Sequence, residues 1–320
     1  MPPPVKPPAL ERGATIRIVA TSSPVEEARL HRGCSEIERL GYVPRWDPRV
    51  LAQQGFFAGS TEERVAKLTS AFEETSSEAV FCARGGYGVN YLLDLLETRR
   101  LKSPKILLGY SDVTSLQAFL WRKRRWVTLY GPMVATGFDA GPGAPCGYDP
   151  VSLSQALSET HQGWALDLRG DILYAGEAEG TLLGGCLTLF VSTLGTPWEV
   201  STRGALLLLE DRGMKPWQID RALVHLRQAG KFEGVRGVVL GEFPDCAPPP
   251  GSASVRAVCE RVLEPLRIPV IWGAAVGHTA RPMLTIPLGV RARLAARGGG
   301  KLDLLEPACS APRPRRRGGK

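Results

Sequence analysis

The sequence has no long hydrophobic run. Its apolar stretches, such as ALLLL at 205–209, are far shorter than the roughly 20 residues that a transmembrane helix needs. The first ten residues, MPPPVKPPAL, also lack the apolar segment that characterises a signal peptide. We therefore expect a cytoplasmic protein with no membrane partner.

Histidine is scarce, and cysteine never occurs in closely spaced pairs. The seven cysteines are odd in number, dispersed and without a C-x-x-C pair, which argues against both a disulfide framework and a zinc site. None of the four histidines belongs to an H-x-x-x-H pair. We expect no metal and no cofactor, and the unpaired thiols favour a reducing compartment.

The body of the chain has little net charge. The formal charge is +8, but five positive residues in the last ten positions leave about +3 for the rest: Arg313, Arg315, Arg316, Arg317 and Lys320. We expect residues 309–320 to form a disordered basic tail, and we expect no nucleic-acid partner.

The remaining composition is that of a globular protein of two domains. Short apolar runs alternate with helix-like segments in the first half, which predicts crossover connections and a mainly parallel sheet. Residues 137–175 are rich in glycine and proline, and shorter strands with fewer helices follow. The predicted class is α/β, with a doubly wound N-terminal domain (1–136), a linker or covering loop (137–175), and a smaller, mixed, β-rich C-terminal domain (176–308).

Ser111 lies in ILLGYSDVTSLQ (106–117), where an apolar run breaks at a glycine and resumes with helical spacing. A strand-to-helix corner exposes a side chain beside the free amides of the helix, where a nucleophile and an oxyanion donor such as the Asp112 amide are useful. The same residues also suit a plain helix N-cap. Both interpretations fit the local pattern.

A second corner is ARGGYG (83–88), which also follows an apolar run. Adjacent glycines let backbone amides approach a ligand closely, so this turn suits an oxyanion hole or a phosphate. It has no P-loop lysine, and an ordinary glycine turn explains it equally well.

An acid and a base follow two later apolar runs. His278 ends PVIWGAAVGH and is the best candidate for a general base, although a hydrogen-bonded structural histidine gives the same pattern. Glu210 ends ALLLLE and could orient an imidazole, or could pair with Arg212 at a sheet edge. The order Ser, acid, His matches α/β-hydrolases, but Val113 replaces the second glycine of their nucleophile elbow.

Taken together, these stretches resemble the LD-carboxypeptidase family of serine peptidases over residues 14–306. The resemblance rests on eight short blocks in the same order: ARGGYG, GYSDVT, LLGGCLTL, LGTPWE, LLLLEDRG, IDRALVHLRQAG, GVVLGEF and GHTARPMLTIPLG. It implies Ser111 as nucleophile, Glu210 as the acid and His278 as the base. It also implies an oxyanion hole, which we assign to the amides of Gly86 and Asp112.

The resemblance further implies a substrate and an assembly. The family cleaves D-alanine from murein-derived tetrapeptides, and it includes microcin C immunity peptidases that hydrolyse peptidyl- or aminoacyl-nucleotides. A homodimer is expected. Arg84 and Arg281 are candidates for binding a terminal carboxylate because they lie near the site residues in sequence.

One departure from the family pattern and one alternative function are also visible in the sequence. Cys186 stands where the family commonly has asparagine, so a polar contact of the substrate or the domain interface is lost here. A non-catalytic module that binds a nucleotide through the RGGYG turn is the alternative from another functional class.

Overall fold

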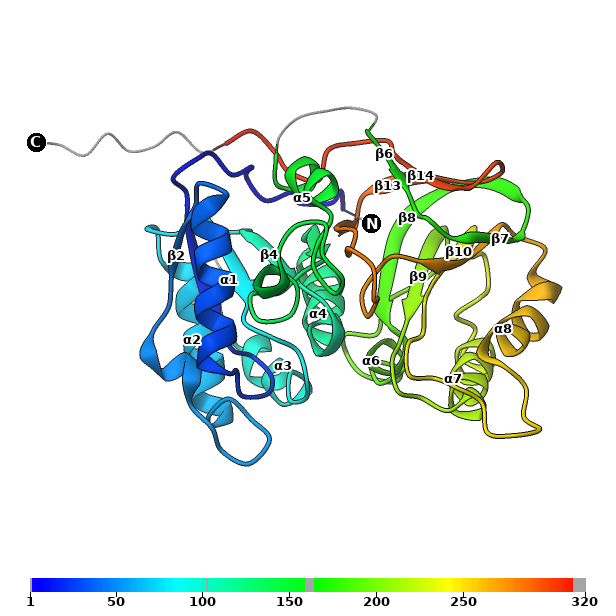
Figure 1. Ribbon diagram of the computed structural model, residues 1–320, viewed down its shortest axis with the longest axis horizontal. Helices are drawn as coiled ribbons and strands as arrows, with labels where there is room; N and C mark the ends of the chain where they lie inside the picture. Colours follow the sequence, from blue (N-terminus) through cyan, green and yellow to red (C-terminus); the bar gives the residue numbers. More distant parts are fainter. Residues whose placement is uncertain (1, 100, 102, 159–163, 313–320) are drawn as a thin grey trace, which may run out of the picture.

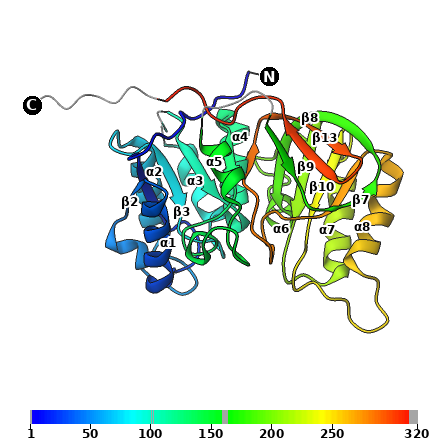
Figure 2. The ribbon, with the colours of Figure 1, turned by 45° about the horizontal axis from the view of Figure 1, so that its top comes forward.

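The computed structural model describes residues 2–99, 101, 103–158 and 164–312, and contains two β-sheets that lie in different halves of the molecule (Figure 1). Figure 2 shows the same two halves side by side after rotation. The fold class predicted from the sequence, α/β with one mainly parallel and one mixed sheet, is confirmed. Among the described residues, no helix combines the length and apolar character needed to cross a bilayer.

The first sheet has the strand order β12-β5-β4-β3-β1-β2. Its neighbours are all parallel except β12, which runs antiparallel to β5. Residues of β3, β4 and β5 are all buried, as expected for strands covered on both faces. The strands are β1 (Thr15–Val19), β2 (Val43–Arg45), β3 (Ala79–Cys82), β4 (Ile106–Gly109), β5 (Thr128–Tyr130) and β12 (Ile286–Leu288).

Helices connect the parallel strands of this sheet. Ser60 starts α2 with a capping box that it forms with Glu63, and α4 is buried from its first residue to Trp121. The order 2-1-3-4-5 has its switch point between β1 and β3, where ligands bind in sheets of this kind. The helices are α1 (Glu27–Arg39), α2 (Thr61–Glu73), α3 (Asn90–Glu97) and α4 (Thr114–Arg124), with 3-10 turns η1 (Pro48–Leu51) and η2 (Ser111–Val113).

The second sheet has the order β6-β14-β13-β8-β9-β10-β11-β7. Its centre, β8 to β11, is parallel, and the outer strands are antiparallel. The strands are β6 (Trp164–Asp167), β7 (Asp171–Tyr174), β8 (Gly176–Cys186), β9 (Ala205–Glu210), β10 (Gly237–Gly241), β11 (Val270–Ala274), β13 (Arg291–Ala296) and β14 (Gly300–Leu304). The helices that follow its strands are α6 (Leu187–Val191), α7 (Pro216–Gln228) and α8 (Val255–Leu263), the last continued by η4 (Glu264–Leu266).

Successive side chains of β9 point to opposite faces of the sheet and pack into two different hydrophobic cores. Leu207 and Leu209 pack with the apolar residues of α7 and α8, whereas Leu206 and Leu208 belong to the core that extends through the first half. The ALLLL run is therefore continuous because both faces of the strand are covered. Glu210 ends this run inside the protein.

Two details differ from the expected organisation. Residues 137–175 are not a bare linker, because they contain η3 (Phe138–Ala140), α5 (Pro150–Leu157) and two strands of the second sheet. Residues Ile286–Leu288 pair with β5 of the first sheet, so the C-terminal half contributes a strand to the N-terminal sheet.

Residues 309 and 310 are ordered, although we expected a disordered tail from position 309. Cys309 is buried, and Ser310 exchanges backbone hydrogen bonds with Pro7 and Ala9. These contacts hold the end of the described chain against the N-terminal segment. Residues 313–320, which include the five basic residues of the tail, lie outside the described residues.

Candidate active site

Ser111 occupies the corner between β4 and α4. β4 ends at Gly109, Tyr110 is extended, and Ser111 opens η2 with a φ of +63°. A non-glycine residue in the left-handed region costs about 1–3 kcal/mol and often marks a functional turn. The strand-to-helix corner predicted from the sequence is therefore present, and it is strained at the serine, as in a nucleophile elbow.

The glycine pair of the RGGYG turn lies directly against this corner. A Cβ at Gly85 would come within 2.9 Å of the Ser111 Cβ and 3.1 Å of its hydroxyl. Gly86 has a φ of +119°, and a Cβ there would collide with the Ser23 hydroxyl. Glycine is thus required at both positions, one for the approach to Ser111 and the other for its backbone conformation.

Asp112 links the Ser111 turn to the segment that follows the RGGYG turn. Its buried carboxylate accepts a hydrogen bond of 2.9 Å from the Val89 amide, just after the RGGYG turn. Burial raises the pKa of this carboxyl against the effect of its hydrogen bonds. In the part of the chain that the structure describes, the amides of Gly86 and Asp112 donate to no protein acceptor.

Glu210 and His278 form a close pair at the ends of β9 and of the segment after β11. The His278 Nδ1 lies 2.8 Å from Oε2 and 3.2 Å from Oε1 of the carboxylate, and the His278 amide donates to Oε2 at 3.0 Å. Burial lowers the pKa of His278, but the charge and hydrogen bond of Glu210 outweigh it, and the net pKa is raised. Glu210 therefore fixes the imidazole and favours its protonated form.

Two glycines make room for the Glu210 side chain. A Cβ at Gly241 would lie 2.5 Å from the Glu210 Cβ, and one at Gly277 would collide with the carboxyl group itself. Gly277 also has a φ of +60°. The glycines in the GVVLGEF and GHTARP blocks thus allow the second sheet to close around a fully buried carboxylate.

A cavity of about 430 Å³ brings the predicted site residues together. Ser111, His278, Gly86 and Arg84 line it, together with Cys186 and Arg212. Glu210 lies behind His278, out of the lining. Among the hydrogen bonds of the described residues there is none from the Ser111 hydroxyl to the imidazole, and catalytic contacts of this kind often tighten only when substrate binds.

The two arginines that we expected to bind a carboxylate have different positions. Arg84 lines the cavity and donates to the Pro24 carbonyl at 3.0 Å, while its buried Nε has no partner in the described structure. Arg281 does not line the cavity: its guanidinium is held by Glu242 and by the carbonyls of Arg169 and Gly273. The structure therefore does not bring Arg281 to the cavity, although it lies only three positions from His278 in the sequence.

Cys186 lies at the boundary between the two sheets. Its side chain is buried, which raises the pKa of the thiol well above its ordinary value. Its amide donates to the Thr114 hydroxyl of α4 at 3.0 Å. A hydrogen bond from the backbone amide of Cys186 to the Thr114 side chain therefore joins the two halves here.

Several residues of the site gave no separate signal in the sequence. The Tyr130 hydroxyl donates to Oε1 of Glu210 at 2.5 Å, and Asp211 accepts from the Thr188 amide and hydroxyl at 2.8 and 2.7 Å. Arg212 reaches the cavity while paired with Asp245 at 2.6 Å. Asp211 and Arg212 directly follow Glu210, which could have marked them, whereas Tyr130 ends an ordinary apolar run.

A larger cavity of about 710 Å³ lies elsewhere, between the end of α4 and residues 199–203 and 230–233. Its charged side chains are largely paired with one another, including Lys231 with Glu199 and Arg203 with Glu233. The described residues contain no group of three potential metal ligands. The smaller cavity therefore combines a nucleophile, a base and free amides, and the larger one does not.

Comparison with known proteins gives the same family on both halves of the chain. A model of the LD-carboxypeptidase N-terminal domain matches residues 16–131, and a model of the C-terminal domain matches residues 179–294. A probable murein peptide carboxypeptidase of Bacillus subtilis is 35% identical over 295 residues, covering 90% of this chain and 91% of that protein.

Two further proteins are similar over nearly the whole chain. The microcin C7 self-immunity protein MccF of Escherichia coli is 28% identical over 313 residues, covering 87% of this chain and 90% of that protein. The crystal structure of a muramoyltetrapeptide carboxypeptidase from Oxalobacter formigenes has a TM-score of 0.80 and 27% identity, covering 94% of this chain and 100% of that one. These matches confirm the resemblance inferred from the eight blocks. The chain belongs to the LD-carboxypeptidase family of serine peptidases.

Proposed function

We propose that this protein is a serine carboxypeptidase that hydrolyses the amide bond before the terminal D-alanine of murein-derived tetrapeptides. The observation that carries the proposal is that His278, paired with the buried Glu210, lines the same cavity as the strained Ser111. The Ser-acid-His combination needs no metal to generate a nucleophile at neutral pH.

In the proposed first step, the Ser111 hydroxyl attacks the carbonyl carbon of the scissile amide. The His278 Nε2 accepts the hydroxyl proton, and Glu210 stabilises the imidazolium through its contacts with Nδ1. The tetrahedral intermediate then collapses, the imidazolium gives its proton to the amide nitrogen, and the amino acid leaves. Water enters, loses a proton to His278 and hydrolyses the acyl-enzyme.

The oxyanion is assigned to the amides of Gly86 and Asp112. Both belong to turns that are fixed before substrate arrives, by the Ser23 contacts on one side and by the Asp112 carboxylate on the other. Donors that are already oriented contribute most when the carbonyl oxygen becomes negative. The absence of protein acceptors for these two amides, within the described residues, supports this role.

Arg84 is the proposed anchor for the terminal carboxylate of the peptide. It lines the cavity and is in no ion pair among the described residues, whereas Arg212 already pairs with Asp245. A guanidinium can bind a carboxylate with two parallel hydrogen bonds. An enzyme that anchors this group removes the last residue of a peptide.

The murein substrate is supported by two similar proteins, a probable murein peptide carboxypeptidase and a muramoyltetrapeptide carboxypeptidase. The similarity to MccF supports a second candidate, hydrolysis of peptidyl- or aminoacyl-nucleotides by the same residues. The homodimer and the cytoplasmic location stay predictions. A purely nucleotide-binding module has less support, because the RGGYG turn is packed against Ser111 and Ser23.

The test is to assay the purified chain on a murein tetrapeptide and on an aminoacyl-sulfamoyl adenosine, beside labelling by a fluorophosphonate. Release of D-alanine with labelling at Ser111 supports the proposal. Preference for the nucleotide substrate supports the second candidate. Hydrolysis of neither substrate, with no labelling of Ser111, would overturn both.

A further inference from the structure

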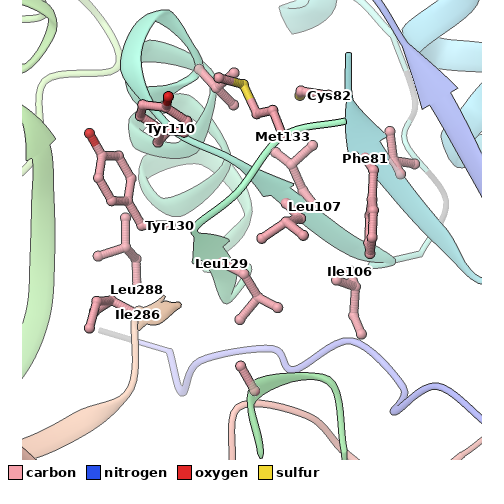
Figure 3. Close-up of a cluster of buried hydrophobic side chains, with 14 of the residues drawn as sticks. Phe81, Cys82, Ile106, Leu107, Tyr110, Leu129, Tyr130, Met133, Ile286 and Leu288 are labelled. Carbon is pink, nitrogen blue, oxygen red and sulfur yellow. The ribbon is translucent and has the colours of Figure 1, made fainter. Parts of the chain in front are cut away.

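Tyr130 connects the nucleophile corner to the acid across the two halves of the protein. We propose that it is a positioning residue for the hydrolysis, which holds Glu210 and the Ser111 turn in one geometry. The inference rests on the proposed function and adds a fourth residue to its machinery. Figure 3 shows Tyr130 beside Tyr110 at the edge of the apolar cluster, with its hydroxyl pointing out of that cluster.

The Tyr130 hydroxyl has two partners. It donates to Oε1 of Glu210 at 2.5 Å and accepts from the Ser111 amide at 3.4 Å. Oε2 of the same carboxylate accepts from the His278 amide at 3.0 Å and contacts Nδ1 at 2.8 Å. One oxygen of Glu210 is therefore held mainly by tyrosine and the other by histidine.

The position of Tyr130 follows from strand register. Gly109 pairs with Tyr130 in the first sheet, so the residue that ends β5 lies beside the strand that leads to Ser111. In the second sheet, Cys186 pairs with Glu210 at the ends of β8 and β9. A Cβ at Gly185 would lie 3.0 Å from the Tyr130 ring, so glycine at that position lets the ring reach the acid.

The Tyr130 hydroxyl stays protonated over the pH range in which the enzyme would be assayed. Burial and the neighbouring Glu210 charge raise the pKa of Tyr130 well above its ordinary value. It therefore acts as a neutral donor to the carboxylate. A neutral donor of this kind holds Oε1 in place and weakens the effect of the carboxylate charge on the neighbouring imidazole.

Other charged groups face the pair and are unchanged by a substitution at 130. Asp211 raises the pKa of His278 and Arg212 lowers it. The Cys186 thiol faces Tyr130 and Glu210, and the Tyr110 ring lies 5.1 Å from the imidazole, centroid to centroid. A change in the pH profile on altering Tyr130 would thus report the Tyr130–Glu210 bond.

The test is Tyr130→Phe, which keeps the ring and removes the hydroxyl. We expect kcat for the peptide and the rate of fluorophosphonate labelling at Ser111 to fall about 10-fold to 100-fold, the range expected for losing a hydrogen bond to a charged group, with KM little changed. Without this donor, the Glu210 charge acts more strongly on the imidazole and should raise the pKa of His278 further, so the acidic limb of both pH profiles should move to higher pH.

Tyr148→Phe is the matched control. Tyr148 is also fully buried, and its hydroxyl also donates to a carboxylate, that of Glu36, outside the cavity. Both variants lose a tyrosine–carboxylate bond and should lose similar thermal stability. Only Tyr130→Phe should change the labelling rate and the pH profile.

A second variant keeps the test decisive if Tyr130→Phe does not fold. Incorporation of 3-fluorotyrosine at position 130 retains the hydroxyl and makes it a stronger donor, so the acidic limb should move to lower pH, opposite to the shift for phenylalanine. A wild-type rate and a wild-type pH profile in every variant that folds would overturn the role of Tyr130. Failure of the proposed function itself is recognised separately, because the wild-type protein would then not be labelled at Ser111.

Discussion

His278 Nδ1 lies 2.8 Å from Oε2 of Glu210, although 68 positions separate the two residues in sequence. The carboxylate is fully buried and the imidazole faces a cavity that Ser111 also lines. The pair therefore forms inside the second half of the protein, and its imidazole lines a cavity that residues of the first half also line. This relationship makes the chemistry of the site testable residue by residue.

Ser111→Ala should lower hydrolysis of the preferred substrate by about 10⁴-fold to 10⁶-fold, because the members of a triad act as a unit. Fluorophosphonate labelling, followed by mass spectrometry, should be lost in parallel. Ser252→Ala, in an exposed loop, is the control and should keep both signals. Near-normal hydrolysis by Ser111→Ala would exclude the serine mechanism.

The pH profile should report His278. The imidazole must be neutral to accept a proton, and its pKa is raised above 6.5, so activity should rise with pH through a value above 6.5. The profile of kcat/KM and an NMR titration of the histidine measure this directly. A profile that is flat from pH 5 to pH 8 would contradict the assignment of His278 as base.

Glu210→Gln should move the acidic limb of the pH profile to lower pH and should also slow the reaction. Without the carboxylate charge, burial dominates and the pKa of His278 should fall below its ordinary value. The rate should fall about 10⁴-fold, the loss seen when an amide replaces the acid of such a triad. Glu242→Gln, whose carboxylate pairs with Arg281 outside the cavity, is the matched comparison. Equal losses in the two variants would show that Glu210 acts only through stability.

Gly85→Ala should impair catalysis without requiring a change in the backbone of the turn. The added Cβ would meet the Ser111 Cβ at 2.9 Å and displace the hydroxyl, and a displacement of about 1 Å can cost about 100-fold in rate. Rates are compared with thermal melting of the same sample. A variant with wild-type rates would show that the Ser111 corner yields without loss of geometry.

Arg84→Ala should raise KM with less effect on kcat if the guanidinium binds the terminal carboxylate. An amidated peptide should be a poor substrate for the wild-type enzyme and should not distinguish wild type from the variant. Arg256→Ala, on α8 and away from the cavity, is the control. Unchanged KM for the free-acid peptide would assign the carboxylate to another group.

Local sequence predicts those parts of the site that are turns after strands. Ser111 and the RGGYG turn could be found because each follows an apolar strand, and in a parallel sheet such ends meet at one edge. The turn at Ser111 departs from the standard nucleophile elbow, because Val113 replaces its second glycine. The structure shows how valine is accommodated: its two methyl groups pack against Gly109, where a Cβ would lie 3.1 Å from each of them.

Contacts between the two sheets could not be predicted in this way. Tyr130 ends an apolar run like any core residue, and nothing near it in sequence indicates a carboxylate from position 210. Arg281 shows the converse, because it lies three positions from His278 but its guanidinium binds Glu242 and two carbonyls. Proximity along the chain does not fix where a long side chain ends.

The sequence by itself determined the family, the α/β class and the order of the candidate nucleophile, acid and base, since these depend on short motifs and on local periodicity. Only the tertiary structure decided that β12 returns to the first sheet, that Arg84 rather than Arg281 lines the cavity, and that Tyr130 bridges Ser111 and Glu210. The reason is physical: local motifs set the backbone of each corner, whereas strand register and the packing of two sheets set which corners meet.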